Sequence, residues 1–277
     1  MVTFLPTPIG NLQDITLHTL EVLGQCDVLL CEDTRVSKKL VSLLNTRGLL
    51  SPKTYTYHAF HTHNQKEFLE QVPLEFFNQN IGFLSDAGMP CVSDPGVELV
   101  RFLQAHNLPY EALGGISAVT LVVALSGIVE KEFCFLGFPP HKLKERTQFL
   151  ANAFKNPYPV ILYESPHRLV ETLELMAQID SKREIFLAKE LTKKHAQTFK
   201  SSVGGILKLI SDSKDSALLK GEWVMVLDGA PLNANESVLT QEMLLSLEIP
   251  PKIKAKILAK LKGGSVSEYY DILCKKQ

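Results

Sequence analysis

Short apolar runs alternate with segments of helical periodicity along the first half of the chain. Four of these runs are typical of strands: residues 2–5, 28–31, 81–84 and 110–113, of which 81–84 has the pattern of a buried strand. Apolar residues at helical spacing follow the runs, as at Leu17, Leu20 and Leu23. This alternation predicts one doubly wound α/β domain, which we assign to residues 1–126.

The second half of the chain carries a similar pattern. Its strand-like runs are residues 133–136, 160–163, 185–188 and 223–227. We interpret residues 127–131 as a linker and expect a second α/β domain at residues 132–230. The functional site is then expected between the domains, where the loops of the first domain face the second.

The last part of the chain has a helical pattern. Residues 231–237 are polar and predict a linker, and Pro250-Pro251 and Gly263-Gly264 divide residues 238–277 into three short helices. Seven lysines between positions 252 and 276 make this segment the most basic part of the chain. Its lysines can contact phosphates, or they can form a solvated face around a small core.

The loop at residues 85–96 contains two glycines, two prolines and two aspartates. It follows a strand run, and ligands of open α/β sheets bind beyond the carboxyl ends of strands. Small residues at Ala87 and Gly88 let the backbone approach a ligand closely. We interpret the loop as a ligand wall. The alternative is an ordinary connection in which Pro95 begins the next helix.

Polar residues follow other strand runs of the first domain. Residues 32–35 form a candidate site, with the alternative that Asp33 caps the next helix and Arg35 is solvated. Residues 114–118, Gly-Gly-Ile-Ser-Ala, precede an apolar helix whose backbone N–H groups can hold an anionic group. This sequence is neither a G-x-G-x-x-G motif nor a P-loop.

Charged residues also follow two strand runs of the second domain, at residues 164–168 and 189–194. Solvated loops explain them equally well. The histidines at positions 58, 61 and 63 lack cysteine or carboxylate partners at ligand-like spacing, so we predict no metal site.

Composition and charge narrow the class of protein. The chain has 29 basic and 30 acidic residues, so any contact with nucleic acid needs a local basic patch. Five cysteines without a C-x-x-C motif fit a reduced cytoplasmic protein. We see no signal-peptide pattern, and no apolar stretch approaches the ~20 residues that span a bilayer.

Several motifs occur together in a fixed order. They are residues 6–16, 32–35, 61–64, 85–88, 94–96, 163–165, 167–168, 189–193 and 220–222. Together they resemble the motifs of the tetrapyrrole methylase family, and within it those of the bacterial 2′-O-ribose methyltransferases of small-subunit ribosomal RNA. The resemblance covers almost the whole chain, although Met89 and Gly114 stand where that family has threonine and proline.

The resemblance implies S-adenosylmethionine as the methyl donor, bound in the cleft between two α/β domains, and a homodimer. It implies that the acceptor is the 2′-hydroxyl of a cytidine in the decoding region of 16S rRNA, free or in the small ribosomal subunit. Carried over motif by motif, the cofactor contacts are Pro8, Gly10, Asp86, Ala87, Gly88, Ser117, Ala118, Tyr163 and Ala188.

Methyl transfer to a ribose hydroxyl is helped by a proton acceptor. We expect Asp33 or Glu190 in that role, with Arg35 and Lys189 holding phosphate or stabilising the developing alkoxide. These residues belong to the most polar strand ends around the inferred cleft. Two alternatives are a methylase of the same fold acting on a small molecule, and a non-catalytic RNA-binding relative.

Overall fold

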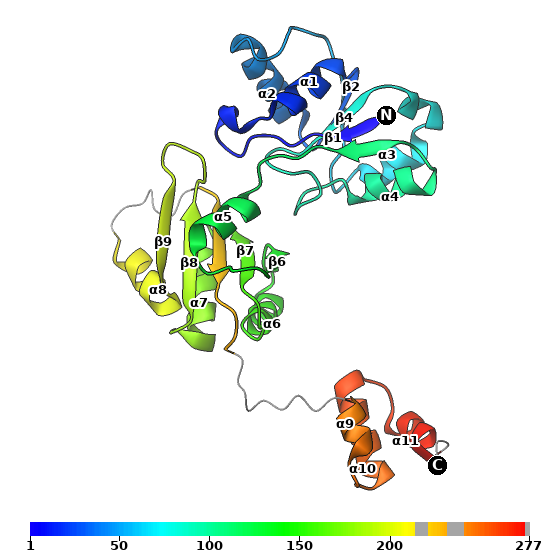
Figure 1. Cartoon of the computed structure of the whole chain (residues 1–277), viewed down its shortest axis with the longest axis vertical. Helices are drawn as coiled ribbons and strands as arrows, with labels where there is room; N and C mark the ends of the chain where they lie inside the picture. The colour runs from blue at the N-terminus through cyan, green and yellow to red at the C-terminus, as the bar shows by residue number, and fades with distance from the viewer. Residues whose placement is uncertain (214–220, 232–240, 275–277) are drawn as a thin grey trace. The chain divides into compact units, whose positions relative to one another are not determined.

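The computed structural model describes residues 1–213, 221–231 and 241–274 (Figure 1). Lys220 of the predicted motif, most of the predicted linker, and Lys275 and Lys276 lie outside these ranges. The chain divides into two compact units, Met1–Ala230 and Pro231–Gln277, which we describe separately. The domain boundaries predicted from the sequence stay a prediction.

A parallel five-stranded sheet forms the first part of the larger unit, in the order β3-β2-β4-β1-β5. Its strands are β1 (Val2–Phe4), β2 (Val28–Cys31), β3 (Thr56–Ala59), β4 (Ile81–Leu84) and β5 (Tyr110–Ala112). The central strands β1, β2 and β4 are buried throughout, which agrees with their mainly apolar sequences.

Helices cover both faces of this sheet. Helices α1 (Leu17–Gln25) and α2 (Thr34–Thr46) place Leu23, Val41 and Leu44 in one apolar core. Helices α3 (Gln65–Gln71) and α4 (Val97–Ala105), with the 3-10 helix η2 (Leu74–Asn78), contribute to the core on the opposite face. A second 3-10 helix, η1 (Leu12–Asp14), precedes α1.

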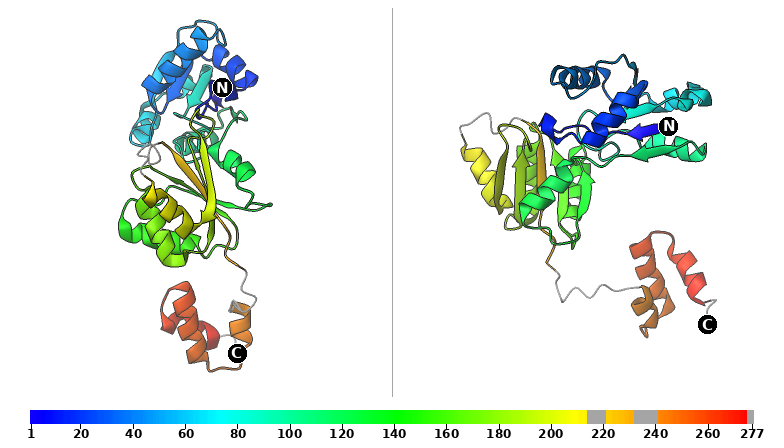
Figure 2. Two further views of the ribbon diagram at one scale, coloured as in Figure 1. Left: turned by 90° about the vertical axis from the view of Figure 1, so that its left-hand side faces the viewer. Right: turned by 45° about the horizontal axis from the view of Figure 1, so that its top comes forward.

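A second, mixed sheet follows in the order β6-β7-β10-β8-β9. Its strands are β6 (Cys134–Gly137), β7 (Val160–Glu164), β8 (Glu184–Lys189), β9 (Gln197–Ser202) and β10 (Trp223–Leu227). Strand β6 is parallel to β7, whereas β10 is antiparallel to both β7 and β8. Figure 2 shows this sheet from two further directions.

Helix α5 (Ala118–Ser126) packs on one face of the second sheet. Its side chains Val119 and Val122 share an apolar core with residues of β7, β8 and β10. Helices α6 (Leu143–Ala153), α7 (Leu169–Asp180) and α8 (Val203–Asp212) contribute to a separate apolar core of the same sheet. The chain therefore places α5 next to the second sheet immediately after leaving the first (Figure 1).

The smaller unit contains helices α9 (Gln241–Ser246), α10 (Pro251–Lys262) and α11 (Val266–Cys274). Leu244, Ala255 and Leu258 are buried, and most lysines of α10 are exposed. The structure thus confirms the predicted fold class, two α/β parts and a helical C-terminal segment. None of the helices in the described ranges is both long and apolar enough to cross a membrane.

Close packing in the first sheet can be tested at Gly82 of β4. A Cβ at this position would lie 2.7 Å from Cδ1 of Leu5 and 2.9 Å from Cδ2 of Leu29. We expect Gly82→Ala to lower the free energy of unfolding by about 1–3 kcal/mol, measured by urea denaturation. Gly114→Ala is the matched control, because no atom lies within 4 Å of its Cβ position. Equal stability of the two variants would contradict this packing.

Candidate functional site

A cavity of about 400 Å³ lies between loops of the two sheets. Its size is in the range typical of small-molecule sites. The first sheet contributes Ile9, Glu32, Asp86, Ala87, Gly88, Met89, Val92, Ser93, Asp94, Ser117 and Ala118 to the wall. The second contributes Phe138, Tyr163, Glu164, Ser165, Pro166, Leu191, Glu222, Trp223 and Val224.

The loop after β1, residues 6–11, contacts three other strand-end loops. Thr7 pairs with Gly88, with N···O distances of 2.9 and 3.0 Å between their backbones. The backbone N–H of Asn11 donates to Oγ1 of Thr192 over 3.1 Å. Gly115 leaves no room for a side chain beside Pro6. The loop at residues 6–11 thus connects the loops that follow β4, β5 and β8.

The loop at residues 85–96 has an unusual backbone. Cys91 and Ser93 adopt left-handed conformations with φ of 68° and 69°, although neither is glycine. Such conformations are costly and persist only where the surrounding structure fixes them. Here the N–H of Val92 donates to the carbonyl of Met89 over 3.2 Å. Strain of this kind concentrates at ligand sites, which agrees with the prediction of a ligand wall.

A second loop of this kind follows β8. Glu190 and Thr192 have φ of 52° and 64°. The Glu190 carboxylate accepts a hydrogen bond from the N–H of Glu222 over 3.0 Å. The Lys193 ammonium lies 2.9 Å from Glu190 and 3.2 Å from Glu222. These contacts hold Leu191 and Glu222 in the wall of the cavity.

Carboxylates dominate the charge of the cavity wall. The N–H of Asp86 donates to Oε2 of Glu32 over 3.1 Å, which ties the end of β2 to the loop after β4. Burial raises the pKa of Glu32 and of Asp86. Burial, together with the charge of Glu32, raises the pKa of Asp94 to about 7. No lysine or arginine of the described ranges is part of this wall, so the cavity favours a ligand with positive charge.

Six of the nine residues predicted to contact the cofactor line this one cavity. They are Asp86, Ala87, Gly88, Ser117, Ala118 and Tyr163. Pro8 and Gly10 flank the wall residue Ile9, and a side chain at position 10 would collide with Lys193. Ala188 is fully buried in the apolar core between α5 and the second sheet.

The four predicted catalytic residues lie outside the cavity wall. Asp33 caps α2 and pairs with the Arg35 guanidinium over 2.6 Å, while the Arg35 side chain is 89% exposed. The hydrogen bonds from Arg35 lower the pKa of Asp33 to about 2. Lys189 is buried, with its ammonium 5.8 Å from the centre of the Trp223 ring. Glu190 is held by Lys193 and Glu222, as described above.

The sequence neighbours of these residues line the cavity instead. Glu32 and Leu191 are wall residues. So are Glu222, Asp94 and Phe138, which were not predicted as site residues. For Asp94 a signal was present, because it lies in the loop interpreted as a ligand wall. Within the described parts of the chain, no group of three or more His, Cys, Asp or Glu side chains could hold a metal ion.

Comparison with known proteins places the chain in a class. A model of the tetrapyrrole (corrin/porphyrin) methylases matches residues 1–206. The chain belongs to this family and is a methyltransferase. The fold agrees, because the uroporphyrin-III C-methyltransferase of Thermus thermophilus, solved with S-adenosylhomocysteine, superimposes with a TM-score of 0.54. That comparison covers 81% of this chain and 96% of the other at 15% identity.

Two relatives are similar over nearly the whole chain, and both are named ribosomal RNA small subunit methyltransferase I. The protein of Campylobacter fetus is 44% identical over 276 residues, which is 99% of each chain. That of Helicobacter pylori strain 26695 is 44% identical over 285 residues, covering 98% of this chain and 96% of the relative.

The half-buried carboxyl of Asp94 should cost stability at neutral pH. An unfolded aspartate ionises near 3.8 and the folded Asp94 near 7, so the folded state loses stability relative to the unfolded state between these values. We expect Asp94→Asn to raise the melting temperature. The gain should be small near pH 4, grow up to about pH 7 and then stay constant.

Thermal unfolding from pH 4 to pH 8 measures this effect. Glu130→Gln is the control, because Glu130 is exposed and its replacement should change stability little at any pH. A melting temperature of Asp94→Asn that is lower than wild type at pH 8 would contradict the assignment of a desolvated carboxyl.

Proposed function

We propose that this chain transfers a methyl group from S-adenosylmethionine to the 2′-hydroxyl of a cytidine in the decoding region of 16S rRNA. Methyl transfer from S-adenosylmethionine to small-subunit rRNA agrees with the family and with the names of the relatives. The cytidine and its 2′-oxygen are the finer part of the proposal. The observation that best supports methyl transfer from S-adenosylmethionine is that six of the predicted cofactor residues line one and the same cavity.

The charge and the exposed backbone of the cavity wall suit this cofactor. When bound, S-adenosylmethionine supplies a methyl group on a positively charged sulfur. Glu32, Asp86 and Asp94 provide negative charge in a partly desolvated wall, where a cation is favoured. Gly88, with φ of +88° and Ile9 3.3 Å from its Cβ position, brings bare backbone to the wall. We propose that Gly88, Ser117, Ala118 and Tyr163 hold the cofactor.

We propose Asp94 as the proton acceptor for the ribose hydroxyl. A base whose pKa lies near the working pH is the most effective, and that of Asp94 is about 7. Asp33 and Glu190, the candidates from the sequence, are already paired with Arg35 and Lys193 outside the wall. The Arg35 side chain is paired with Asp33 but 89% exposed, so its guanidinium can also contact a phosphate of the RNA from solvent.

Other parts of the proposal concern partners. Ribosomal RNA is the acceptor, and the exposed lysines of α10 can add phosphate contacts that salt would weaken. A homodimer and a cytoplasmic location also belong to the proposal, since they come from the family resemblance and from the cysteine pattern alone.

Mapping of methyl groups tests the proposed function. Small ribosomal subunits from cells lacking the modification are incubated with the protein and labelled S-adenosylmethionine, and the RNA is read for 2′-O-methylated positions. We expect one methylated cytidine in the decoding region. Methylation of a base, of another region, or only of a tetrapyrrole would contradict the proposal.

The proton acceptor is tested with three isosteric variants. We expect Asp94→Asn to lower kcat by about 10²–10⁴, and kcat/KM of the wild type to rise with pH through about 7. Asp33→Asn and Glu190→Gln should keep kcat within about 10-fold of wild type, because neither carboxylate reaches the cavity. Wild-type turnover by Asp94→Asn would contradict this assignment. Calorimetry of S-adenosylmethionine binding to Asp94→Asn is the control, because it shows whether the variant still binds the cofactor.

A further inference from the structure

An aromatic side chain stands half exposed at the cavity. Phe138 is 51% exposed and belongs to the wall. Its ring centre lies 5.3 Å from that of Tyr163, which in turn lies 4.9 Å from that of Phe135. These three rings form a row, with Tyr163 partly buried and Phe138 open to solvent. The aromatic face of Phe138 therefore marks the mouth of the cavity rather than its interior.

The loop that carries Phe138 has little conformational freedom. The register of β6 against β7 shifts between Phe135 and Gly137, as in a β-bulge. Gly137 has φ of +68°, and its Cβ position lies 3.4 Å from Oγ of Ser93 in the opposite loop. Pro139 and Pro140 follow directly, and proline fixes φ. The exposed ring is thus presented on a stiff support.

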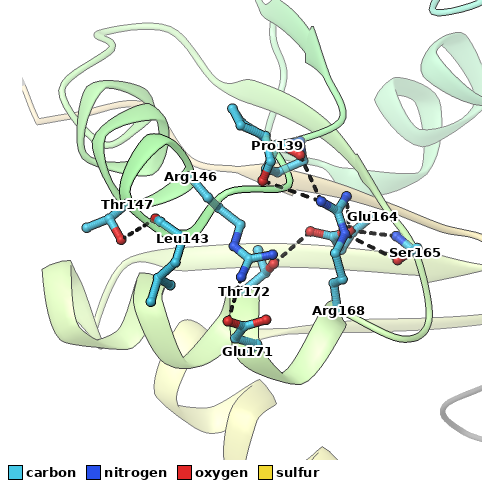
Figure 3. Close-up of polar contacts among 10 residues, drawn as sticks. Pro139, Leu143, Arg146, Thr147, Glu164, Ser165, Arg168, Glu171 and Thr172 are labelled. Carbon is cyan, nitrogen blue, oxygen red and sulfur yellow. Dashed lines mark hydrogen bonds and ion pairs between the residues drawn. The ribbon is translucent and has the colours of Figure 1, made fainter.

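The ion pair between Arg168 and Glu164 supports this loop (Figure 3). The Arg168 guanidinium donates to the carbonyls of Pro139 and Pro140 over 3.0 and 3.4 Å. It also lies 2.7 Å from Oε1 of Glu164, whose side chain is fully buried. Oγ1 of Thr172 donates to the other oxygen of Glu164 over 2.6 Å. Arg168 is therefore fixed on one side and holds the carbonyls next to Phe138 on the other.

We propose that Phe138 is a stacking platform for the nucleobase of the acceptor nucleotide, an inference that rests on the proposed function. The base of a nucleotide is attached to the ribose carbon next to the one that bears the 2′-hydroxyl. A hydroxyl presented to the cavity therefore brings its base to the mouth. An exposed, rigid aromatic face at that place matches a base, because base–aromatic stacking is a main source of affinity for single-stranded RNA.

The position of Phe138 argues for RNA rather than for the cofactor. Of the residues proposed to hold the cofactor, Gly88, Ser117 and Ala118 lie in or directly after the loops that follow β4 and β5, whereas Phe138 lies in the loop after β6. A preorganised ring loses little freedom on binding, so the whole of the stacking contributes to affinity. Stacking is tolerant of base identity, so Phe138 contributes affinity and placement rather than a choice between bases.

Steady-state kinetics with small ribosomal subunits test the platform. We expect Phe138→Leu to raise KM for the subunits by about 10-fold, and Phe138→Trp to stay within about 3-fold of wild type because it keeps the aromatic face. The affinity for S-adenosylmethionine, measured by calorimetry, should change less than about 2-fold in both variants, because the inference assigns the exposed face of this ring to the base and not to the cofactor.

Phe133→Leu is the matched control, since Phe133 is 38% exposed and lies outside the cavity wall. The inference is overturned if Phe138→Leu leaves KM for the subunits unchanged, if it weakens S-adenosylmethionine binding instead, or if Phe133→Leu has the same effect. A wild-type protein that methylates no small-subunit RNA would overturn the proposed function first, and the inference with it.

Discussion

The structure of the site depends on one short loop that contacts three others. Residues 6–11 follow the central strand β1, pair with Gly88 in the loop after β4, and contact Thr192 and Lys193 in the loop after β8. Gly115, after β5, lies against Pro6 in the same loop. The last contacts reach the loop after β8, so residues 6–11 connect the two sheets beside the cavity. The two prolines of this loop lower the entropy lost in holding that arrangement.

The loops after β4 and β8, which residues 6–11 contact, carry both strained backbone and negative charge. The left-handed residues Cys91, Ser93, Glu190 and Thr192 all lie in the two loops that face each other across the cavity. Their backbone cost is sustained by hydrogen bonds and by the Glu190–Lys193–Glu222 contacts. The result is a wall with carboxylates and exposed backbone, which a cationic cofactor can neutralise. If Asp94 is the proton acceptor that we propose, stability and function oppose each other at this residue.

Much of this fold follows from the sequence. The mainly apolar runs of β1, β2, β4, β7, β8 and β10 predicted strands, and these are the central strands of the two sheets, which are buried on both faces. The edge strands β3 and β9 were missed, since Thr56–Ala59 and Gln197–Ser202 are polar and mostly exposed. An edge strand needs no continuous apolar run, so periodicity alone does not reveal it.

The site was predictable only as far as the strand ends. The sequence identifies residues 32–35 and 189–193 as polar strand ends, but not which side chain of each turns toward the cavity. Glu32 and Asp33 lie in the bend between β2 and α2, and only the tertiary structure shows that Glu32 reaches the wall whereas Asp33 caps α2. Phe138 was not predicted as a site residue because its exposure depends on the β6 bulge and on Arg168, which are tertiary features.

A crystal structure with S-adenosylhomocysteine tests the central claim most directly, namely that residues 6–11 and the loops they contact enclose the cofactor site. We predict the ligand within contact distance of Ile9, Gly88, Ala118 and Tyr163, with the Thr7–Gly88 backbone pairing retained. A ligand bound elsewhere, or a cavity closed by side chains in the presence of saturating ligand, would contradict this account.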